Sequence, residues 1–175
     1  MELGTSRLYL RKMNEEDFTS LYEVFGDKEN MKYYPYIFDE GRVRNWIMRN
    51  IERYRVFGFG LWAVVHKETG KVISDCGITM QNINGFIVPE IGYHIHRQFQ
   101  RKGYAKEASE KCRDWAFENT PFNLLYSYMK KANAASSATA RAIGMTLVGD
   151  YIDAESEHTE IYAITRQEWQ ALRKG

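Results

Sequence analysis

Apolar and polar positions alternate with a period of two along several short stretches of the chain, which is the pattern of strands that bury one face. These stretches span residues 8–10, 61–65, 72–80, 90–96, 124–129, 146–151 and 160–164. Elsewhere apolar residues recur every three or four positions, which is the period of a helix. Two such stripes are Val43, Trp46, Ile47, Ile51 and Tyr54, and Tyr104, Ala108, Cys112, Trp115 and Ala116.

Polar residues and glycines mark where these elements begin and end. The expected helix caps are Asn14, Asp39 and Asn133, and the expected helix ends are Gly58 and Gly144. The expected hairpin turn is Asn84-Gly85. Thr165 and Glu168 form a capping box for a last short helix. The order of elements predicts a single domain over residues 1–175 of the α/β (α+β) class. Its mostly antiparallel mixed sheet is expected to have six to seven strands flanked by helices.

One junction between a strand and a helix favours an anion. Its residues are Gln100, Arg101, Lys102, Gly103, Tyr104 and Ala105. A helix that begins here leaves its first backbone N–H groups without intrahelical partners, at the positive end of the helix dipole. Gly103 allows the backbone to bend and to approach a ligand closely. The pattern therefore predicts a site for a phosphorylated ligand.

Bulk properties exclude several classes of function. Lys plus Arg number 24 and Asp plus Glu 23, so the chain lacks the basic field of a dedicated nucleic-acid binder. No segment approaches the run of about 18 apolar residues that a membrane span requires. Neither a P-loop nor a Rossmann dinucleotide motif occurs. Cys76 and Cys112 fall on a strand and on a helix stripe, which predicts buried thiols in a reducing compartment and a cytoplasmic protein.

The turn at 100–105 resembles the Q/R-x-x-G-x-G/A signature of the GNAT superfamily of N-acetyltransferases. A second part of the chain, with Asn133, Ser136, Gly144 and Met145, keeps another spacing of that family. The similarity covers nearly the whole chain and is closest to the ribosomal-protein-alanine N-acetyltransferase (RimJ/RimL-like) branch. It implies a GNAT-like fold, acetyl-CoA as co-substrate, and transfer of the acetyl group to a primary amine such as a protein N-terminus. A homodimer is left open.

The resemblance also implies contacts with the coenzyme. The amides of the 100–105 turn correspond to those that hold the pyrophosphate of acetyl-CoA. The family's two central strands splay apart, and the backbone amides expected to bind the pantetheine arm and thioester carbonyl there are those of His94, Ile95 and His96. Asn133 corresponds to a further coenzyme contact.

Catalytic roles follow from the same resemblance. Glu90 corresponds to a residue that removes the amine proton in some relatives, and a solvated or ion-paired carboxylate is the alternative. His94 and His96 share the predicted polar face, as alternative bases or as a metal pair, but no third ligand is identifiable, so no metal is expected. Ser136 corresponds to the proposed proton donor for the thiolate, and a plain first-turn serine is the alternative. Ala140 stands where many relatives have a tyrosine.

Two segments of the chain are candidates for contacts with the acceptor. Tyr33, Tyr34, Tyr36 and Phe38 form an aromatic cluster that is either a lid on the core or a wall for the substrate. The acidic segment 150–158 suits a cationic acceptor or is simply solvated. Because both cysteines are expected in the core, direct transfer in a ternary complex is favoured. A small amine such as an antibiotic or polyamine is an alternative substrate, and a non-catalytic acyl-CoA-binding module is an alternative function.

Overall fold

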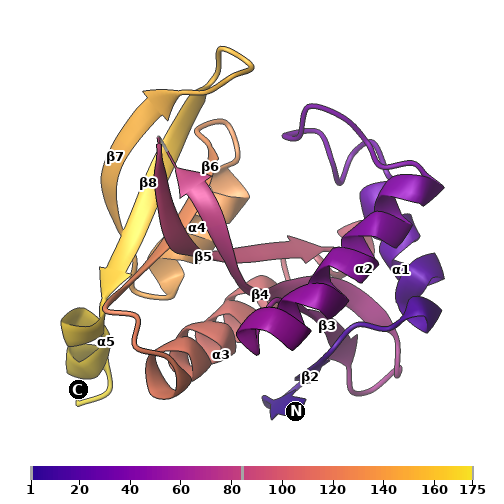
Figure 1. Ribbon diagram of the computed structural model, residues 1–175, viewed down its shortest axis with the longest axis horizontal. Helices are drawn as coiled ribbons and strands as arrows, with labels where there is room; N and C mark the ends of the chain where they lie inside the picture. The colour runs from indigo at the N-terminus through magenta and orange to yellow at the C-terminus, as the bar shows by residue number, and fades with distance from the viewer. Residues whose placement is uncertain (1, 84, 175) are drawn as a thin grey trace.

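The computed structural model describes residues 2–83 and 85–174, and over these ranges the strands form one sheet of eight. The sheet order is β1-β2-β3-β4-β5-β6-β8-β7 (Figure 1). The strands are β1 (Glu2–Gly4), β2 (Leu8–Arg11), β3 (Leu61–His66), β4 (Val72–Ile83), β5 (Phe86–Ile95), β6 (Leu124–Lys130), β7 (Thr146–Ile152) and β8 (His158–Thr165). β5 and β6 run parallel, and the other described neighbours are antiparallel. The predicted mixed, mostly antiparallel class is confirmed.

Two differences from the predicted strands have local causes. The sheet has one strand more than expected, because the short edge strand β1 pairs with β2 and is too brief to show a period. β5 starts at Phe86 instead of Glu90, because its hairpin with β4 continues to the pair Ile83–Phe86. Asn84 of the expected turn lies outside the described residues. Gly85 has a φ of 88°, in the left-handed region that such turns require.

The helices are α1 (Phe18–Phe25), α2 (Glu40–Phe57), α3 (Tyr104–Asn119), α4 (Ala134–Ala142) and α5 (Arg166–Leu172), and η1 (Glu15–Asp17) and η2 (Arg97–Phe99) are short 3-10 turns. The caps lie where the sequence predicts them. Asp39 caps α2, Asn133 caps α4 and Thr165 caps α5, while Asn14 caps η1, which leads directly into α1. Gly58 ends α2 with a φ of 78°.

Residues of β4 show that helices cover both faces of the sheet, because neighbouring residues of a strand point to opposite faces. The Asp75 carboxylate accepts a hydrogen bond from Trp46 Nε1 of α2 at 2.7 Å. Cys76 Sγ, on the other face, lies 3.5 Å from Cys112 Sγ of α3. α2 and α3 therefore pack on opposite faces of β4.

Both thiols are free and fully buried, as predicted, and burial raises the pKa of Cys112 well above its usual value. The surrounding core includes the fully buried side chains of Trp62, Phe117 and Tyr162. Among the residues that the structure describes, no helix combines the length and the apolar character needed to cross a membrane.

Candidate active site

β5 and β6 are parallel neighbours that separate along their length. Within the described residues they pair at one position, Glu90 with Tyr126. Beside this pair, Ser127 Oγ donates a hydrogen bond to the Ile91 carbonyl at 3.1 Å. β5 then continues to Ile95, so its backbone groups on this side face a gap in the sheet. This is the splay that the family resemblance implies.

The ladder between β4 and β5 determines which amides face the gap. The His96 N–H donates to the Ile73 carbonyl at 2.8 Å, and successive N–H groups of an antiparallel ladder alternate between the two sides. The His94 N–H consequently faces β4 as well. The N–H groups of Tyr93 and Ile95 face the gap. On this part of β5 the N–H groups that face the gap are therefore those of Tyr93 and Ile95, which corrects the expectation that the His94 and His96 amides bind the coenzyme.

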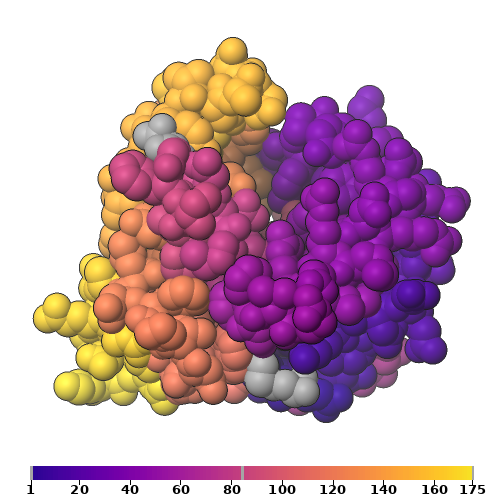
Figure 2. Space-filling view, in the orientation of Figure 1, coloured from indigo at the N-terminus to yellow at the C-terminus, as the bar shows by residue number. Residues whose placement is uncertain are grey.

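Two cavities meet at this gap. The first, here called the Glu90 cavity, has a volume of about 470 Å³ and lies between β5, β6 and the β7–β8 loop. The second, here called the turn cavity, has a volume of about 640 Å³ and follows η2 and the first turns of α3 and α4. Residues that line both are Tyr33, Tyr34, Tyr93, His94, Asn133 and Ser136. In Figure 2 the surface is hollowed between the orange β7–β8 region and the purple N-terminal part.

The turn cavity has the predicted anion cradle as one wall. The lining residues from this turn are Gln100, Arg101, Gly103, Tyr104 and Ala105. Arg101 and Gly103 have φ values of 60° and 80°, so the backbone reverses through two left-handed positions directly before α3. The helix begins at Tyr104, and its first N–H groups therefore lie at the cavity wall. Lys102, also expected in the cradle, is not among the described lining residues.

Arg7 of the N-terminal segment contacts both this turn and the first turn of α3. Its Nη1 donates to the Lys102 carbonyl at 2.8 Å, its Nε donates to Glu107 Oε2 at 2.7 Å, and its guanidinium lies 4.4 Å from the centre of the Tyr104 ring. Burial raises the pKa of Glu107, but hydrogen bonds from Thr5 and from the backbone and side chain of Arg7 outweigh burial and lower that pKa to about 2. The sequence pattern did not reveal Arg7, because its partners are distant in the chain.

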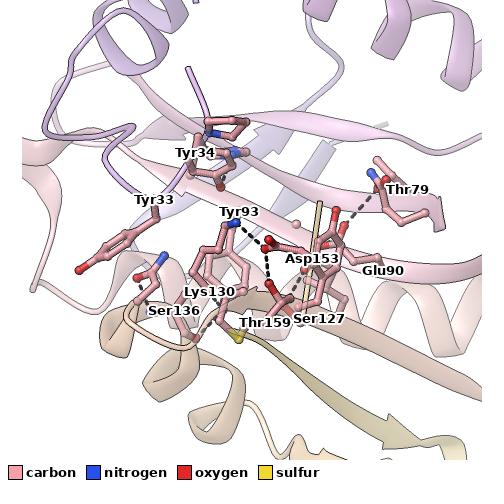
Figure 3. A pocket seen from close by; sticks show the side chains of 18 of the residues that line it. Tyr33, Tyr34, Thr79, Glu90, Tyr93, Ser127, Lys130, Ser136, Asp153 and Thr159 are labelled. Atoms are coloured by element: carbon pink, nitrogen blue, oxygen red, sulfur yellow. Dashed lines mark hydrogen bonds and ion pairs between the residues drawn. The ribbon is translucent and has the colours of Figure 1, made fainter. Parts of the chain in front are cut away.

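Glu90 lies in the wall of the Glu90 cavity and is 8% exposed. Burial raises its pKa to about 7, although a hydrogen bond from Thr79 Oγ1 at 3.1 Å acts in the opposite direction (Figure 3). A Cβ on Gly92 would lie 3.1 Å from Glu90 Oε2, so the glycine leaves room for the carboxylate. A carboxylate with this pKa exchanges protons readily at neutral pH.

Tyr93 and Ser136 join β5 to α4 at the cavity junction. The Tyr93 hydroxyl donates to the Ser136 carbonyl at 2.7 Å, and Ser136 Oγ donates to the Tyr93 hydroxyl at 3.1 Å. Asn133 fixes the start of the same helix by accepting the Ser136 N–H at 3.2 Å. Burial raises the pKa of Tyr93. Ala140, where many relatives have a tyrosine, is fully buried in the core and is not among the described residues that line the two cavities.

His94 belongs to a chain of hydrogen bonds that crosses from the core to the cavity junction. Asp75, which is 0% exposed, accepts from Trp46 Nε1 and lies 2.7 Å from His94 Nδ1. His94 Nε2 lies 2.7 Å from the Tyr34 hydroxyl. Sequence reasoning missed Asp75 and Trp46. The available signal was that Asp75 is the one charged residue in the strand pattern of 72–80.

The aromatic cluster divides into two parts. Tyr33 and Tyr34 line both cavities. Among the described lining residues, Tyr36 and Phe38 appear in neither wall: Arg42 lies 4.0 Å from the centre of the Tyr36 ring, and Phe38 stacks on Phe25. The position of Phe38 agrees with the lid interpretation, and that of Tyr33 and Tyr34 agrees with a substrate wall.

The acidic segment also has internal partners. Lys130 of β6 forms ion pairs with Asp153, with Glu155 at 3.0 Å and with Glu157 at 3.8 Å. Asp153 additionally accepts a hydrogen bond from Thr159 Oγ1 at 2.7 Å. The hydrogen bond from Lys130, helped by that from Thr159, lowers the pKa of Asp153 below its usual range. Since Lys130, Asp153 and Glu155 line the Glu90 cavity, this end of the cavity carries a net negative charge.

Comparison with known proteins agrees with this geometry. The model of the acetyltransferase (GNAT) domain family matches residues 7–146. The chain is 34% identical over 145 residues to the uncharacterized protein YkkB of Bacillus subtilis, covering 82% of this chain and 84% of that protein. An acetyltransferase structure from Agrobacterium tumefaciens is similar with a TM-score of 0.80 at 26% identity over 94% of each chain. The ribosomal L7/L12 alpha-N-protein acetyltransferase RimL, solved in complex with coenzyme A, is similar with a TM-score of 0.78 at 18% identity over 94% of this chain and 98% of that chain.

The chain therefore belongs to the GNAT acetyltransferase family, and the predicted resemblance is confirmed. The protein is accordingly an acyltransferase of the N-acetyltransferase class, whose family uses acetyl-CoA as co-substrate. Its fold is shared with ribosomal-protein acetyltransferases.

Proposed function

We propose that the protein transfers the acetyl group of acetyl-CoA directly to a primary amine, such as a protein N-terminus, in a ternary complex. The observation that carries the proposal is the meeting of the two cavities at the splay, where the Tyr93 and Ile95 amides face the gap. Acetyl-CoA would lie in the turn cavity with its pyrophosphate on the 100–105 turn and with Asn133 beside it. The acceptor would enter through the Glu90 cavity.

Each proton of the reaction has a candidate acceptor or donor. Glu90 takes the proton that the ammonium group loses before attack and passes it to solvent. The neutral nitrogen then attacks the thioester carbonyl, and the Tyr93 and Ile95 amides stabilise the oxyanion. The C–N bond forms, the C–S bond breaks, and the nitrogen loses a second proton. The leaving thiolate gains one proton from the Ser136 hydroxyl, which recovers it from solvent, so one proton is released per turnover.

An α-amine fits this apparatus better than a lysine side chain. An α-amine with a pKa near 8 is about one-tenth neutral at pH 7, whereas a lysine amine with a pKa near 10.4 is under about one-thousandth neutral. A carboxylate with a pKa of about 7 is matched to the first group and is a weak base for the second. This match supports a protein N-terminus as the acceptor.

One observation favours a second candidate, a small cationic amine such as a polyamine or an antibiotic. Asp153 and Glu155 line the Glu90 cavity, and together they exceed the charge of Lys130. An acceptor with a second ammonium group several bonds from the first would be attracted to this end of the cavity.

Direct transfer is supported by the position of the thiols. Cys76 and Cys112 are both fully buried, and neither is among the described residues that line the two cavities. A thiol nucleophile needs access and a lowered pKa, whereas burial raises the pKa of Cys112.

The test is thiol release from acetyl-CoA in the presence of tetrapeptides that begin with alanine or serine, and of spermidine. Release with the peptides supports an N-terminal acceptor, and release with spermidine alone supports the second candidate. Binding of acetyl-CoA with no release for any amine would favour the non-catalytic module. The double variant Cys76→Ala/Cys112→Ala is expected to keep most of the wild-type turnover. Loss of turnover with acetyl-CoA binding intact would contradict direct transfer.

A further inference from the structure

The Tyr34, His94 and Asp75 chain has the arrangement of a proton-accepting unit. Asp75 accepts hydrogen bonds and is fully buried, so the His94 nitrogen that faces it, Nδ1, is the protonated one. His94 Nε2 is then an acceptor, and the Tyr34 hydroxyl donates to it at 2.7 Å. The lone pairs of the Tyr34 oxygen remain available to a hydrogen-bond donor in the cavities.

The position of these three hydrogen-bonded residues relative to Glu90 indicates which proton they can accept. Tyr34 and His94 line both cavities, whereas Glu90 is a lining residue of the Glu90 cavity. The thioester carbonyl must lie where both cavities meet, because it reacts with an acceptor that arrives from one and belongs to a coenzyme held in the other. Tyr34 therefore lies at the junction where the amine and the thioester would meet, whereas Glu90 lies in the wall of the acceptor side.

We infer that Tyr34 is a further catalytic residue, which accepts the second proton of the amine while its own proton passes to His94. This inference rests on the proposed acetyl transfer and specifies how the nitrogen loses its last proton. As the C–N bond forms, the N–H proton moves to the Tyr34 oxygen and the phenolic proton moves to His94 Nε2. His94 becomes an imidazolium, and Asp75 is a positioning residue that holds it in place. The proton returns to solvent from His94 after the product leaves.

The surroundings of the Tyr34 hydroxyl explain why Tyr34 and His94 are needed together. Tyr34 as a whole is 42% exposed, but its hydroxyl lies 2.7 Å from His94 Nε2. Desolvation there, together with the charges of Asp75 and Glu90, raises the pKa of Tyr34, so the phenol does not act as a tyrosinate. A concerted transfer leaves the Tyr34 oxygen neutral before and after the step. The buried Asp75 carboxylate, which Trp46 Nε1 also hydrogen-bonds, can stabilise the positive charge that forms on His94.

A simpler role for the Tyr34 hydroxyl would be to anchor the 27–39 segment over the gap. That segment has other anchors, however. The Phe38 N–H donates to the Phe25 carbonyl at 2.9 Å, and Asn30 Nδ2 donates to the Ile95 carbonyl at 3.2 Å. Removal of one hydroxyl therefore leaves the segment tied at both ends, and the loss can be assayed as chemistry.

The experiment compares Tyr34→Phe with wild type and with Tyr22→Phe, a matched change of an exposed tyrosine that stacks on Phe18 of α1. Steady-state kinetics use acetyl-CoA with the best amine among the alanine and serine tetrapeptides and spermidine. For Tyr34→Phe, kcat is expected to fall about 100-fold with both KM values within about threefold of wild type, because general-base catalysis typically contributes that much. Tyr22→Phe is expected to match wild type.

A double-variant cycle separates a functional unit from independent contacts. Because Tyr34 and His94 act in one step, Tyr34→Phe/His94→Gln is expected to be no slower than His94→Gln alone, within about threefold. Multiplicative losses would overturn the shared step. An unchanged kcat with raised KM values for Tyr34→Phe would overturn the inference and assign an anchoring role instead. The thermal shift given by acetyl-CoA checks that each variant is folded and binds coenzyme.

The failure of this inference is distinguishable from failure of the proposed function. If wild type releases no thiol with any of these amines, the acetyl transfer falls and the inference falls with it. If wild type is active and Tyr34→Phe retains its kcat, the inference alone is overturned.

Discussion

Replacement of Glu90 by glutamine is expected to stabilise the protein and to inactivate it. The pKa of Glu90 is raised by burial from 4.5 to about 7, so the folded state binds more protons than the unfolded state between these pH values. Stability therefore falls as the pH rises through that window. Since each tenfold change in proton affinity corresponds to about 1.4 kcal/mol, the buried carboxylate costs about 3 kcal/mol of stability above pH 7.

Glutamine removes this cost and keeps the local structure. Its side-chain carbonyl can accept the hydrogen bond that Thr79 Oγ1 donates to Glu90. For a domain of this size, about 3 kcal/mol corresponds to an increase of roughly 6 to 12 °C in the thermal midpoint at pH 8. At pH 5 wild-type Glu90 is protonated in the folded state, so the difference between the two proteins is expected to shrink to a few degrees.

The assay is thermal unfolding of both proteins at pH 5 and pH 8, with turnover measured on the same samples. The turnover of Glu90→Gln at pH 7 is expected to be about 100-fold lower, and its pH profile is expected to lose the step near pH 7 and to keep only the titration of the acceptor amine near pH 8. Glu52→Gln, an exposed residue paired with Arg55 on α2, is the control and is expected to change the midpoint little at either pH. An equal or lower midpoint for Glu90→Gln at pH 8 would refute the reasoning, because it would mean that the carboxylate is solvated or paired.

Two further variants test the support of the 100–105 turn by Arg7 and the protonation of the leaving thiolate by Ser136. Arg7→Met removes the donor to the Lys102 carbonyl and the partner of Glu107, so the KM for acetyl-CoA is expected to rise about tenfold with kcat unchanged, as hydrogen bonds to charged groups are worth more than about 1.4 kcal/mol. Steady-state kinetics check this, and an unchanged KM would show that the turn needs no support from Arg7. Ser136→Ala is expected to lower kcat by about 100-fold at an unchanged KM for acetyl-CoA. Full activity of this variant in the thiol-release assay would mean that the thiolate takes its proton elsewhere.

Local sequence patterns predicted the parts of the fold that depend on neighbouring residues. Asp39 and Thr165 cap their helices because a side-chain oxygen needs only an N–H two or three residues away. Gly103 lies in a left-handed conformation for a similarly local reason, and the cradle residues line a cavity. These features can be predicted from one stretch of chain.

The features of the candidate site that the sequence patterns did not reveal depend on residues that are distant in the sequence. The phase of the β5 amides is set by the pairing of His96 with Ile73 of β4, so one strand alone does not reveal which N–H groups face the gap. Tyr34, His94 and Asp75 come from a loop and two strands and meet only in the folded protein. The charge of the acidic segment likewise depends on Lys130, which lies on β6.

The most direct test of the account is the thermal midpoint of unfolding with and without acetyl-CoA, for wild type and for Gly103→Glu. The substitution adds a side chain at a φ of 80° and a negative charge in the cradle. Coenzyme at a hundred times its dissociation constant contributes about 2.7 kcal/mol, which corresponds to a shift of roughly 5 to 11 °C for a domain of this size. Wild type is expected to show this shift, and the variant, if it is folded without ligand, is expected to show none. No shift for wild type at millimolar acetyl-CoA, or an equal shift in both proteins, would contradict this expectation.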